Sequence, residues 1–170
     1  MKVLGIAGWS GAGKTTLIEA MIPLIRARGL TVSTIKHAHH GLDIDRPGRD
    51  SHRHRLAGAT EVLVASGARW ALLRETSEPP PVSELLARLA PVDLVLIEGF
   101  KAEPHDKIEV YRPDLAKPPL WPGRPDIVAV ASDVSLVSDL DVLCLSDPAA
   151  IVAWTLRRLD IPPGQGHRTA

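Results

Sequence analysis

Short apolar segments and amphipathic segments take turns along the chain, and this alternation predicts strands and helices. The first apolar segment, residues 2–7, is rich in strand-forming side chains and ends at Gly8. Apolar residues then recur at helical spacing from Leu17 to Ile25, before a second β-branched segment at residues 30–35. The opening of the chain therefore predicts a strand, a glycine-containing loop, a helix and a second strand, which is a βαβ unit.

A nearly unbroken apolar segment at residues 92–97 stands out in the second half of the chain. Such a segment is typical of a central strand that is buried on both faces. Asp147 and Pro148 predict the start of the last helix, because aspartate caps helix N-termini and proline fits the first turn. Further strands are expected at residues 127–131, at residues 142–145 and, in a more exposed position, at residues 107–111.

The segment between residues 37 and 74 is more polar and less regular. We expect a long loop that becomes helical near Asp50, followed by a hairpin whose strands are residues 61–65 and 69–74. The hairpin and the strand at residues 107–111 predict some antiparallel pairing at an edge of the sheet.

These elements together predict the α/β fold class, with three layers built on a mostly parallel central sheet that is covered on both faces. Neither an internal repeat nor a dividing linker is visible in the sequence. We therefore expect a single domain over residues 1–160, followed by a disordered tail over residues 161–170.

Composition and charge exclude several classes of protein. The 170 residues contain 20 Lys and Arg against 20 Asp and Glu, so the chain lacks the positive charge typical of proteins that bind duplex nucleic acid or anionic membranes. The apolar segments fall short of the roughly 20 residues that span a bilayer, and we expect no secretory signal. Cys144 is the only cysteine, which excludes an internal disulfide and a site with several thiolate ligands. We therefore expect a soluble cytoplasmic domain without a nucleic-acid or membrane partner.

The segment from Gly8 to Thr15 matches the phosphate-loop pattern G-x-x-x-x-G-K-[ST] in full, between a predicted strand and a predicted helix. Glycines allow backbone N–H groups to surround a phosphate, and the N-terminus of the following helix favours an anion. Lys14 would contact the β- and γ-phosphates, Thr15 would coordinate Mg²⁺, and Thr16 would lie near the α-phosphate. The motif predicts a nucleoside-triphosphate site in a P-loop NTPase fold.

A carboxylate at the end of the apolar strand is the candidate partner of the metal ion. Glu98 directly follows residues 92–97, and we expect it to meet Mg²⁺ through water or to orient the attacking water. Lys14 and Glu98 are therefore the candidate catalytic residues, and Thr15 and Glu98 are candidate metal-binding residues.

The polar loop after the second strand supplies further candidates, because the loops that follow parallel strands face the ligand. A second, water-mediated magnesium contact is expected from one of Asp43, Asp45 and Asp50. Asp45 is the residue that we predict for this contact, and a solvated loop is the alternative. The histidines His37, His39 and His40 are expected to order the loop by hydrogen bonds, with a transition-metal site as the alternative.

The identity of the base is predicted from one carboxylate. Guanine presents N1–H and N2–H₂ donors that one carboxylate can accept together, whereas adenine offers no such pair. Asp133 follows the strand predicted at residues 127–131, where a base-reading residue is expected, so we predict that it reads guanine. The usual N-K-x-D motif is missing, and the alternative is that Ser132 and Asp133 form a turn.

Several of these motifs together resemble one known family, that of the molybdopterin-guanine dinucleotide biosynthesis adapter proteins. The motifs that carry the resemblance are Gly8 to Thr16, Ile35-Lys36-His37-x-His39-His40, Asp50-Ser51-x-Arg53, Ala57-Gly58-Ala59 and Asp93-x-x-x-x-Glu98-Gly99-Phe100-Lys101. The resemblance covers most of residues 1–160. The histidine motif and the Glu98 motif narrow the choice of family, because many NTPases share the phosphate loop.

The resemblance implies a GTP-binding protein with slow, Mg²⁺-dependent hydrolysis that forms a homodimer. Its implied partner is the guanylyltransferase that attaches GMP to molybdopterin, and direct binding of molybdopterin stays open. The resemblance places the nucleotide contacts on Gly11, Ala12, Gly13, Lys14, Thr15 and Thr16, and the metal on Thr15 and Glu98.

Other functions on the same fold remain as alternatives. A small-molecule kinase would need a lid, which the proline-rich residues 112–126 do not resemble. A GTPase of nickel-enzyme maturation would explain the histidines but lacks cysteine ligands. A module that only binds a partner and a phosphate is a further alternative. It would differ from a GTP-hydrolysing adapter because it would not hydrolyse the nucleotide.

Overall fold

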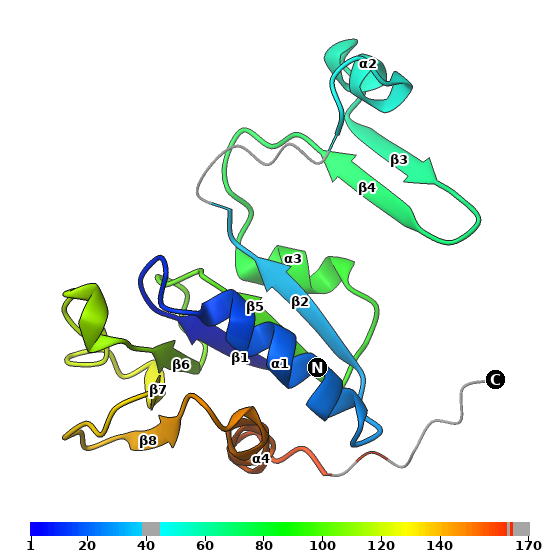
Figure 1. Cartoon of the computed structure of the whole chain (residues 1–170). Helices are drawn as coiled ribbons and strands as arrows, with labels where there is room; N and C mark the ends of the chain where they lie inside the picture. Colours follow the sequence, from blue (N-terminus) through cyan, green and yellow to red (C-terminus); the bar gives the residue numbers. More distant parts are fainter. Residues whose placement is uncertain (39–44, 163, 165–170) are drawn as a thin grey trace. The chain divides into compact units, whose positions relative to one another are not determined.

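The structure, a computed structural model, describes residues 1–38, 45–162 and 164. The predicted site residues His39, His40 and Asp43 lie outside the described residues, as do residues 165–170 of the predicted tail. In chain order the elements are β1 (Lys2–Ala7), α1 (Lys14–Arg26), β2 (Val32–Lys36), α2 (Asp50–Leu56), β3 (Glu61–Ala65), β4 (Trp70–Arg74), α3 (Val82–Arg88), β5 (Leu94–Glu98), β6 (Lys107–Val110), the 3₁₀ turn Pro113–Leu115, β7 (Ile127–Ser132), β8 (Asp141–Cys144) and α4 (Pro148–Arg158) (Figure 1).

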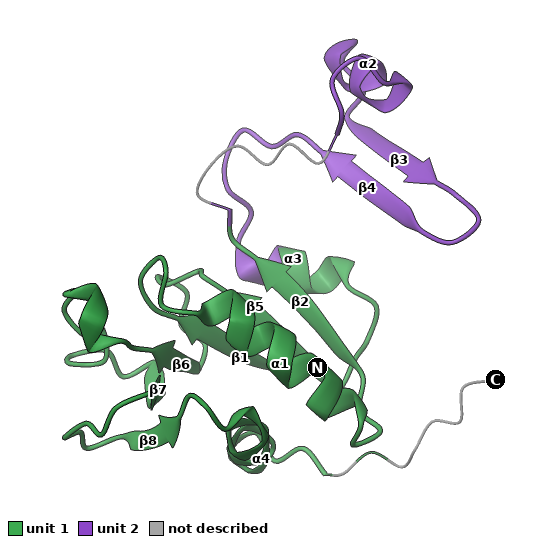
Figure 2. Cartoon of the chain, in the orientation of Figure 1, with its two compact units in different colours: residues 1–37, 85–170 green, residues 38–84 purple. Residues whose placement is uncertain are grey.

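The described residues form two compact units, which are residues 1–37 with 85–170, and residues 38–84 (Figure 2). We call them unit 1 and unit 2. The organisation as a single P-loop domain over residues 1–160 stays a prediction. None of the described helices is long and apolar enough to cross a membrane.

Unit 1 contains a sheet in which the described strands follow the order β2-β5-β1-β6-β7-β8, and each neighbouring pair runs parallel. The apolar segment that predicts a central strand is β5, which lies between β2 and β1, and its residues Leu94 to Ile97 are fully buried. The α/β class with a parallel central sheet is confirmed. Because the strands are parallel, the loops after β1, β5, β6 and β7 meet at one edge of the sheet.

One face of this sheet packs against α1 and α4, which also contact each other. Alternate residues of the strands point to this face, as the pleat of a strand requires. The buried cluster includes Leu4, Ile6, Leu96 and Ile108 from the strands, Leu17 and Met21 from α1, and Ile151 from α4. Burying each such side chain contributes about 1.5–3 kcal/mol, so this layer is the main hydrophobic core. At its start, α4 has the predicted cap, because Oδ1 of Asp147 accepts a hydrogen bond from the N–H of Ala150 at 3.0 Å.

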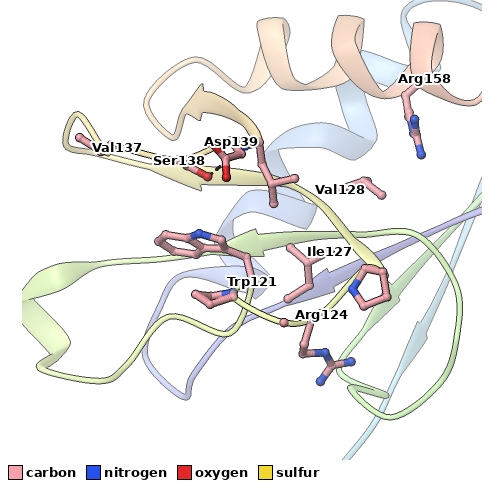
Figure 3. Close-up of a pocket in the computed structure, with 12 residues that line it drawn as sticks. Trp121, Arg124, Ile127, Val128, Val137, Ser138, Asp139 and Arg158 are labelled. Carbon is pink, nitrogen blue, oxygen red and sulfur yellow. Dashed lines mark hydrogen bonds between the residues drawn. The ribbon is translucent and has the colours of Figure 1, made fainter.

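A large hollow of about 900 Å³ lies at the amino end of β7 (Figure 3). Apolar side chains, prolines and two arginines line it, including Trp121, Arg124, Ile127, Val137 and Arg158. The hollow lies where β7 begins, whereas the loops that follow the parallel strands lie at the opposite edge of the sheet.

The strand predicted at residues 107–111 as exposed and antiparallel is neither. β6 lies between β1 and β7, runs parallel to both, and is buried along its whole length. Its polar residues Lys107 and Glu109 alternate with Ile108 and Val110, a pattern that normally places one face in water. The prediction was wrong because both charged side chains find partners inside the protein.

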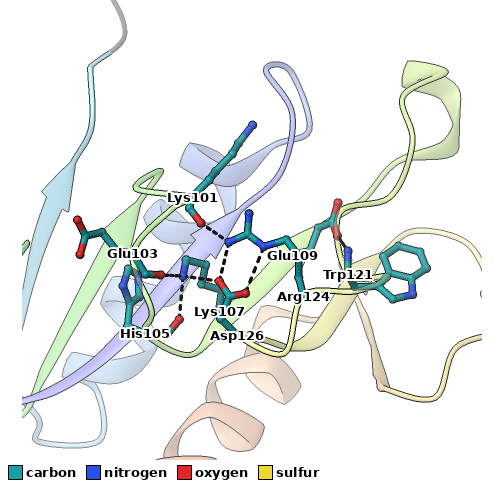
Figure 4. A network of polar contacts seen from close by, with 8 residues as sticks. All are labelled: Lys101, Glu103, His105, Lys107, Glu109, Trp121, Arg124 and Asp126. Carbon is teal, nitrogen blue, oxygen red and sulfur yellow. Dashed lines mark hydrogen bonds and ion pairs between the residues drawn. The ribbon is translucent and has the colours of Figure 1, made fainter.

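Two loops supply the hydrogen-bond partners of Lys107 in the interior (Figure 4). The Lys107 ammonium is completely buried, donates to Oδ2 of Asp126 at 2.8 Å, and also donates to the carbonyl oxygens of Glu103 and His105. Arg124 donates to the same Asp126 carboxylate at 2.6 Å. These hydrogen bonds, first from Arg124 and then from Lys107, hold the pKa of Asp126 well below its usual range against the opposing effect of burial.

Two further features accompany the burial of β6, namely the hydrogen bonds of Glu109 and a glycine in the neighbouring strand β1. The Glu109 carboxylate accepts hydrogen bonds from the N–H groups of Leu120 and Trp121 at 2.9–3.0 Å, while its burial raises its pKa. On β1, a Cβ at Gly5 would lie 2.6 Å from both Nε2 of His105 and Cγ of Lys107. Gly5 thus leaves the space that the buried lysine occupies.

In unit 2, β3 and β4 pair antiparallel, from Glu61 opposite Arg74 to Ala65 opposite Trp70. The predicted hairpin is confirmed, but it forms a two-stranded sheet of its own, so its placement at an edge of the central sheet was wrong. The physical reason is that a hairpin completes its pairing locally and does not need a strand of the parallel sheet.

We predict that Asp126→Ala lowers the free energy of unfolding by about 3–5 kcal/mol, because it leaves the buried Lys107 charge without its carboxylate. Urea unfolding near pH 7 measures this loss. Since the pKa of Asp126 is lowered on folding, the difference from the wild type should shrink as the pH falls below about 4. Asp106→Ala is the matched control: it breaks an ion pair with Arg158 that is exposed, and it should cost less than about 1 kcal/mol. Equal losses in the two variants would contradict the buried pair.

Candidate functional site

The loop between β1 and α1 has the backbone that the phosphate-loop motif requires. Gly8, Gly11 and Gly13 have φ angles of 136°, 80° and 100°, which favour glycine over other residues. A Cβ at Gly8 would also collide with the carbonyl oxygen of Val110 on β6. The loop therefore passes directly against the neighbouring strand before α1 begins at Lys14.

A hollow of about 410 Å³, which we call the loop pocket, lies over this loop and the start of α1. The residues that line it are Ser10, Gly11, Gly13, Lys14, Thr15, Thr16, Lys36 and Glu98. The structure thus brings together the predicted residues of the phosphate loop and the predicted carboxylate at the end of β5. Ala12, which belongs to the loop itself, is nearly fully buried. The larger hollow in Figure 3 contains none of the predicted site residues.

Three polar side chains contact one another at one side of the loop pocket. The Thr15 hydroxyl donates to Oε1 of Glu98 at 2.9 Å, and Nζ of Lys36 lies 3.4 Å from Oε2 of the same carboxylate. Hydroxyl and carboxylate oxygens are ligands that suit Mg²⁺, which also keeps several waters. Thr15 and Glu98 therefore fit a magnesium ion. Among the described residues there is no cluster of three or more His, Cys, Asp or Glu that suggests another metal site.

Lys14 also lines the loop pocket. Its ammonium donates to the carbonyl oxygen of Trp9 at 2.8 Å. Partial burial lowers the pKa of Lys14, and the nearby Glu98 carboxylate opposes this shift. A cation that is partly removed from water at the N-terminus of a helix attracts an anionic group strongly, because the screening by solvent is reduced.

Asp45 and Asp50 belong to unit 2. Asp45 is buried, accepts a hydrogen bond from the Ser51 hydroxyl at 2.6 Å, and lies 3.6 Å from Nε of Arg55. Asp50 forms an exposed ion pair with Arg53. A magnesium contact by Asp45 stays a prediction.

Asp133 follows β7 at the same edge of the sheet as the phosphate loop. Its Oδ2 accepts a hydrogen bond from Nη1 of Arg112 at 2.6 Å, and Nε of the same arginine donates to the carbonyl oxygen of Ala12 at 3.0 Å. The predicted base-reading residue is therefore connected to the phosphate loop through Arg112. That Asp133 reads guanine stays a prediction.

The sequence reasoning missed Lys36 and Arg112 around the loop, and it expected Trp9 to be a packing residue. Lys36 ends β2 at the carboxyl edge of the sheet, and this position is a signal that would have identified it. Arg112 lies in a proline-rich segment without a recognisable motif. Trp9 donates from Nε1 to the carbonyl oxygen of Pro118 at 2.7 Å, and the Lys101 ammonium lies 4.5 Å from its ring centroid. Its role depends on a segment more than a hundred residues away.

Comparison with known sequences identifies relatives along most of the chain. Residues 3–133 match the family model MobB, described as molybdopterin guanine dinucleotide synthesis protein B. A molybdopterin-guanine dinucleotide biosynthesis adapter protein of Escherichia coli is 44% identical over an alignment of 151 residues, and the match covers 85% of this chain and 86% of the relative. The protein of the same name in Haemophilus influenzae is 43% identical and covers 83% of this chain and 80% of the relative.

Solved structures agree with these relationships. A crystal structure of molybdopterin-guanine biosynthesis protein B has a TM-score of 0.73 at 29% identity, and the match covers 92% of this chain and 99% of that structure. A MobB homologue from Bacillus stearothermophilus has a TM-score of 0.71 at 26% identity, with 95% and 100% covered. The sequence match and the shared fold together establish that this chain belongs to the MobB family of molybdopterin-guanine dinucleotide synthesis proteins.

Proposed function

We propose that this chain is a GTP-binding adapter that assists the guanylyltransferase that converts the molybdopterin cofactor to its guanine dinucleotide form. The observation that supports it most directly is the loop pocket, where Lys14, Thr15 and Glu98 meet at the N-terminus of α1. The Escherichia coli relative is named a biosynthesis adapter protein, which supports the partner class. Molybdopterin itself is a further candidate ligand of the adapter.

The triphosphate would lie on the phosphate loop, with backbone N–H groups and Lys14 around the β- and γ-phosphates. Thr15 and Glu98 would hold Mg²⁺, which neutralises charge that develops on the phosphates. Glu98 would also orient a water molecule for attack on the γ-phosphate. Among the described residues, the cations that line the loop pocket are Lys14 and Lys36. Turnover would be slow, because an arginine on the γ-phosphate contributes roughly 10³–10⁵ in rate and neither cation is one.

The strand order supports the assignment of the base to Asp133. Glu98 lies on β5 at one side of β1, whereas Asp133 follows β7 on the other side, beyond β6. A nucleotide whose γ-phosphate faces Glu98 would extend its base toward β6 and β7. There the Asp133 carboxylate would accept hydrogen bonds from N1–H and N2–H₂ of guanine.

Unit 2 supports the homodimer. Leu63 pairs with Leu72 and Ala65 pairs with Trp70, so these side chains share one face of the hairpin. Leu63, Trp70 and Leu72 are 61%, 67% and 39% exposed. An apolar face of this kind marks an interaction site, and a second copy of the chain would cover it.

Lys14→Ala should weaken GTP binding by about 10- to 100-fold, because it removes a charge-assisted hydrogen bond to the phosphates. Calorimetric titrations with Mg²⁺ and either GTP or ATP measure this effect, and the wild type should prefer GTP. The control Lys2→Ala removes an exposed lysine at the other end of β1 and should leave binding unchanged. A Lys14→Ala variant that binds GTP like the wild type would refute the nucleotide site, and a preference for ATP would favour a kinase.

Glu98→Gln should slow GTP hydrolysis by about 100-fold, because an amide holds magnesium-bound water poorly and cannot accept a proton from it. Phosphate release in a single turnover, with the protein in saturating excess over GTP, measures the rate. Glu19→Gln, which changes an exposed residue of α1, should leave the rate unchanged. Unaltered hydrolysis in Glu98→Gln would exclude Glu98 from the reaction.

Leu63→Ser combined with Trp70→Ser should convert a dimer into a monomer, because the apolar face of the hairpin is lost. Light scattering after size exclusion measures the mass. Val137→Ser alters a fully exposed apolar residue of unit 1 and should not change the mass. A hairpin variant that remains dimeric would place the interface elsewhere.

A further inference from the structure

Arg112 connects the two parts of the proposed nucleotide site. It follows β6, the strand between β1, which leads into the phosphate loop, and β7, which leads to Asp133. Its guanidinium donates from Nε to the carbonyl oxygen of Ala12 at 3.0 Å and from Nη1 to Oδ2 of Asp133 at 2.6 Å. A Cβ at Gly13 would lie 3.8 Å from Nε and Nη2, so the guanidinium lies alongside the phosphate loop. One planar group thus bridges the carboxyl ends of three neighbouring strands.

The bridge differs from an ordinary surface ion pair of the same exposure. The side chains of Arg158 and Asp106 form such a pair, with exposed fractions of 47% and 39%, against 41% and 37% for Arg112 and Asp133. Exposed pairs of this kind add little to stability. Arg112, however, makes a second directed hydrogen bond to the phosphate loop, and its fork geometry fixes the orientation of both partners. Its contacts therefore set a distance and an angle between the loop and the Asp133 carboxylate.

We propose that Arg112 is the positioning residue for recognition of the base: it holds the Asp133 carboxylate at the place where a guanine reaches it when the triphosphate lies on the phosphate loop. This inference rests on the proposed GTP binding. A carboxylate has about four lone-pair positions, so Asp133 can accept from Arg112 at Oδ2 and still accept from two donors of the base.

This arrangement compensates for the missing N-K-x-D motif. A linear motif places its cation and its carboxylate in one loop. In this chain the carboxylate follows β7 and the cation follows β6, so two strands supply what a single segment supplies elsewhere. Specificity for guanine then depends on the geometry of the sheet edge, and it is lost when the bridge is broken even if the phosphate contacts remain.

The test compares GTP with inosine triphosphate, which lacks the N2 amino group, and with inorganic triphosphate, which has no base. The wild type should bind GTP about 10-fold or more tightly than inosine triphosphate, because one charge-assisted hydrogen bond separates them. Arg112→Ala should bring this ratio close to one, while binding of inorganic triphosphate changes far less. Arg112→Lys keeps the charge but not the fork, so it should retain affinity for triphosphate and still lose most of the discrimination.

Two further variants make the test specific. Asp133→Asn should shift the preference toward xanthosine triphosphate, whose C2 carbonyl accepts a hydrogen bond from the new amide. Arg158→Ala is the matched control, because it removes an equally exposed, ion-paired arginine at the amino end of β6, and its GTP to inosine triphosphate ratio should equal that of the wild type. Circular dichroism verifies that each variant is folded.

The outcomes separate the inference from the function on which it rests. If the wild type binds GTP and ATP equally well, both the proposed GTP binding and the role of Arg112 are overturned. If the wild type prefers GTP and Arg112→Ala preserves the full ratio of GTP to inosine triphosphate, only the role of Arg112 is overturned. A reduced ratio in Arg112→Ala and in Arg112→Lys, with an unchanged ratio in Arg158→Ala, supports the inference.

Discussion

The site depends on one constraint, which is that the strands of the central sheet run parallel with β1 between β5 and β6. Parallel strands end at one edge, so the loop after β1 has Glu98 of β5 on one side and Arg112 after β6 on the other. Gly8 lets this loop pass against the carbonyl oxygen of Val110. The order of the strands therefore divides the site into two sides. One side has the Glu98 carboxylate and the lysines, and the other has Arg112 and the Asp133 carboxylate.

Buried charges hold the segment that leads from this edge to the start of β6. Asp126 binds both Lys107 on β6 and Arg124, and Arg124 also donates to the carbonyl oxygen of Lys101 (Figure 4). Lys101 belongs to the segment after Glu98, and its ammonium faces the ring of Trp9 in the phosphate loop. The buried lysine and Asp126 thus hold the segment that follows Glu98, so the charged residue at the start of β6 has a structural role.

Membership of the MobB family bears on both sides of the site. The family match over residues 3–133 includes the phosphate loop, Glu98, Arg112 and Asp133. The proposed slow turnover would suit an adapter, because a long-lived complex would leave time for a partner enzyme to act. The bridge through Arg112 would ensure that the nucleotide held in this complex carries guanine.

The sequence by itself determined the features that depend on residues close together in the chain. These are the glycine-lysine-threonine loop, the apolar strand that ends at Glu98, the capped start of α4 and the hairpin pairing. These features depend on local backbone preferences and on periodicity, so they can be predicted from short segments. The tertiary structure alone decided that β6 is buried, because Lys107 needs Asp126 and Glu109 needs the N–H groups of Leu120 and Trp121. It also decided the contacts of Lys36 with Glu98 and of Arg112 with Ala12 and Asp133. Strand order creates these pairs between distant residues, and no local pattern in the sequence encodes it.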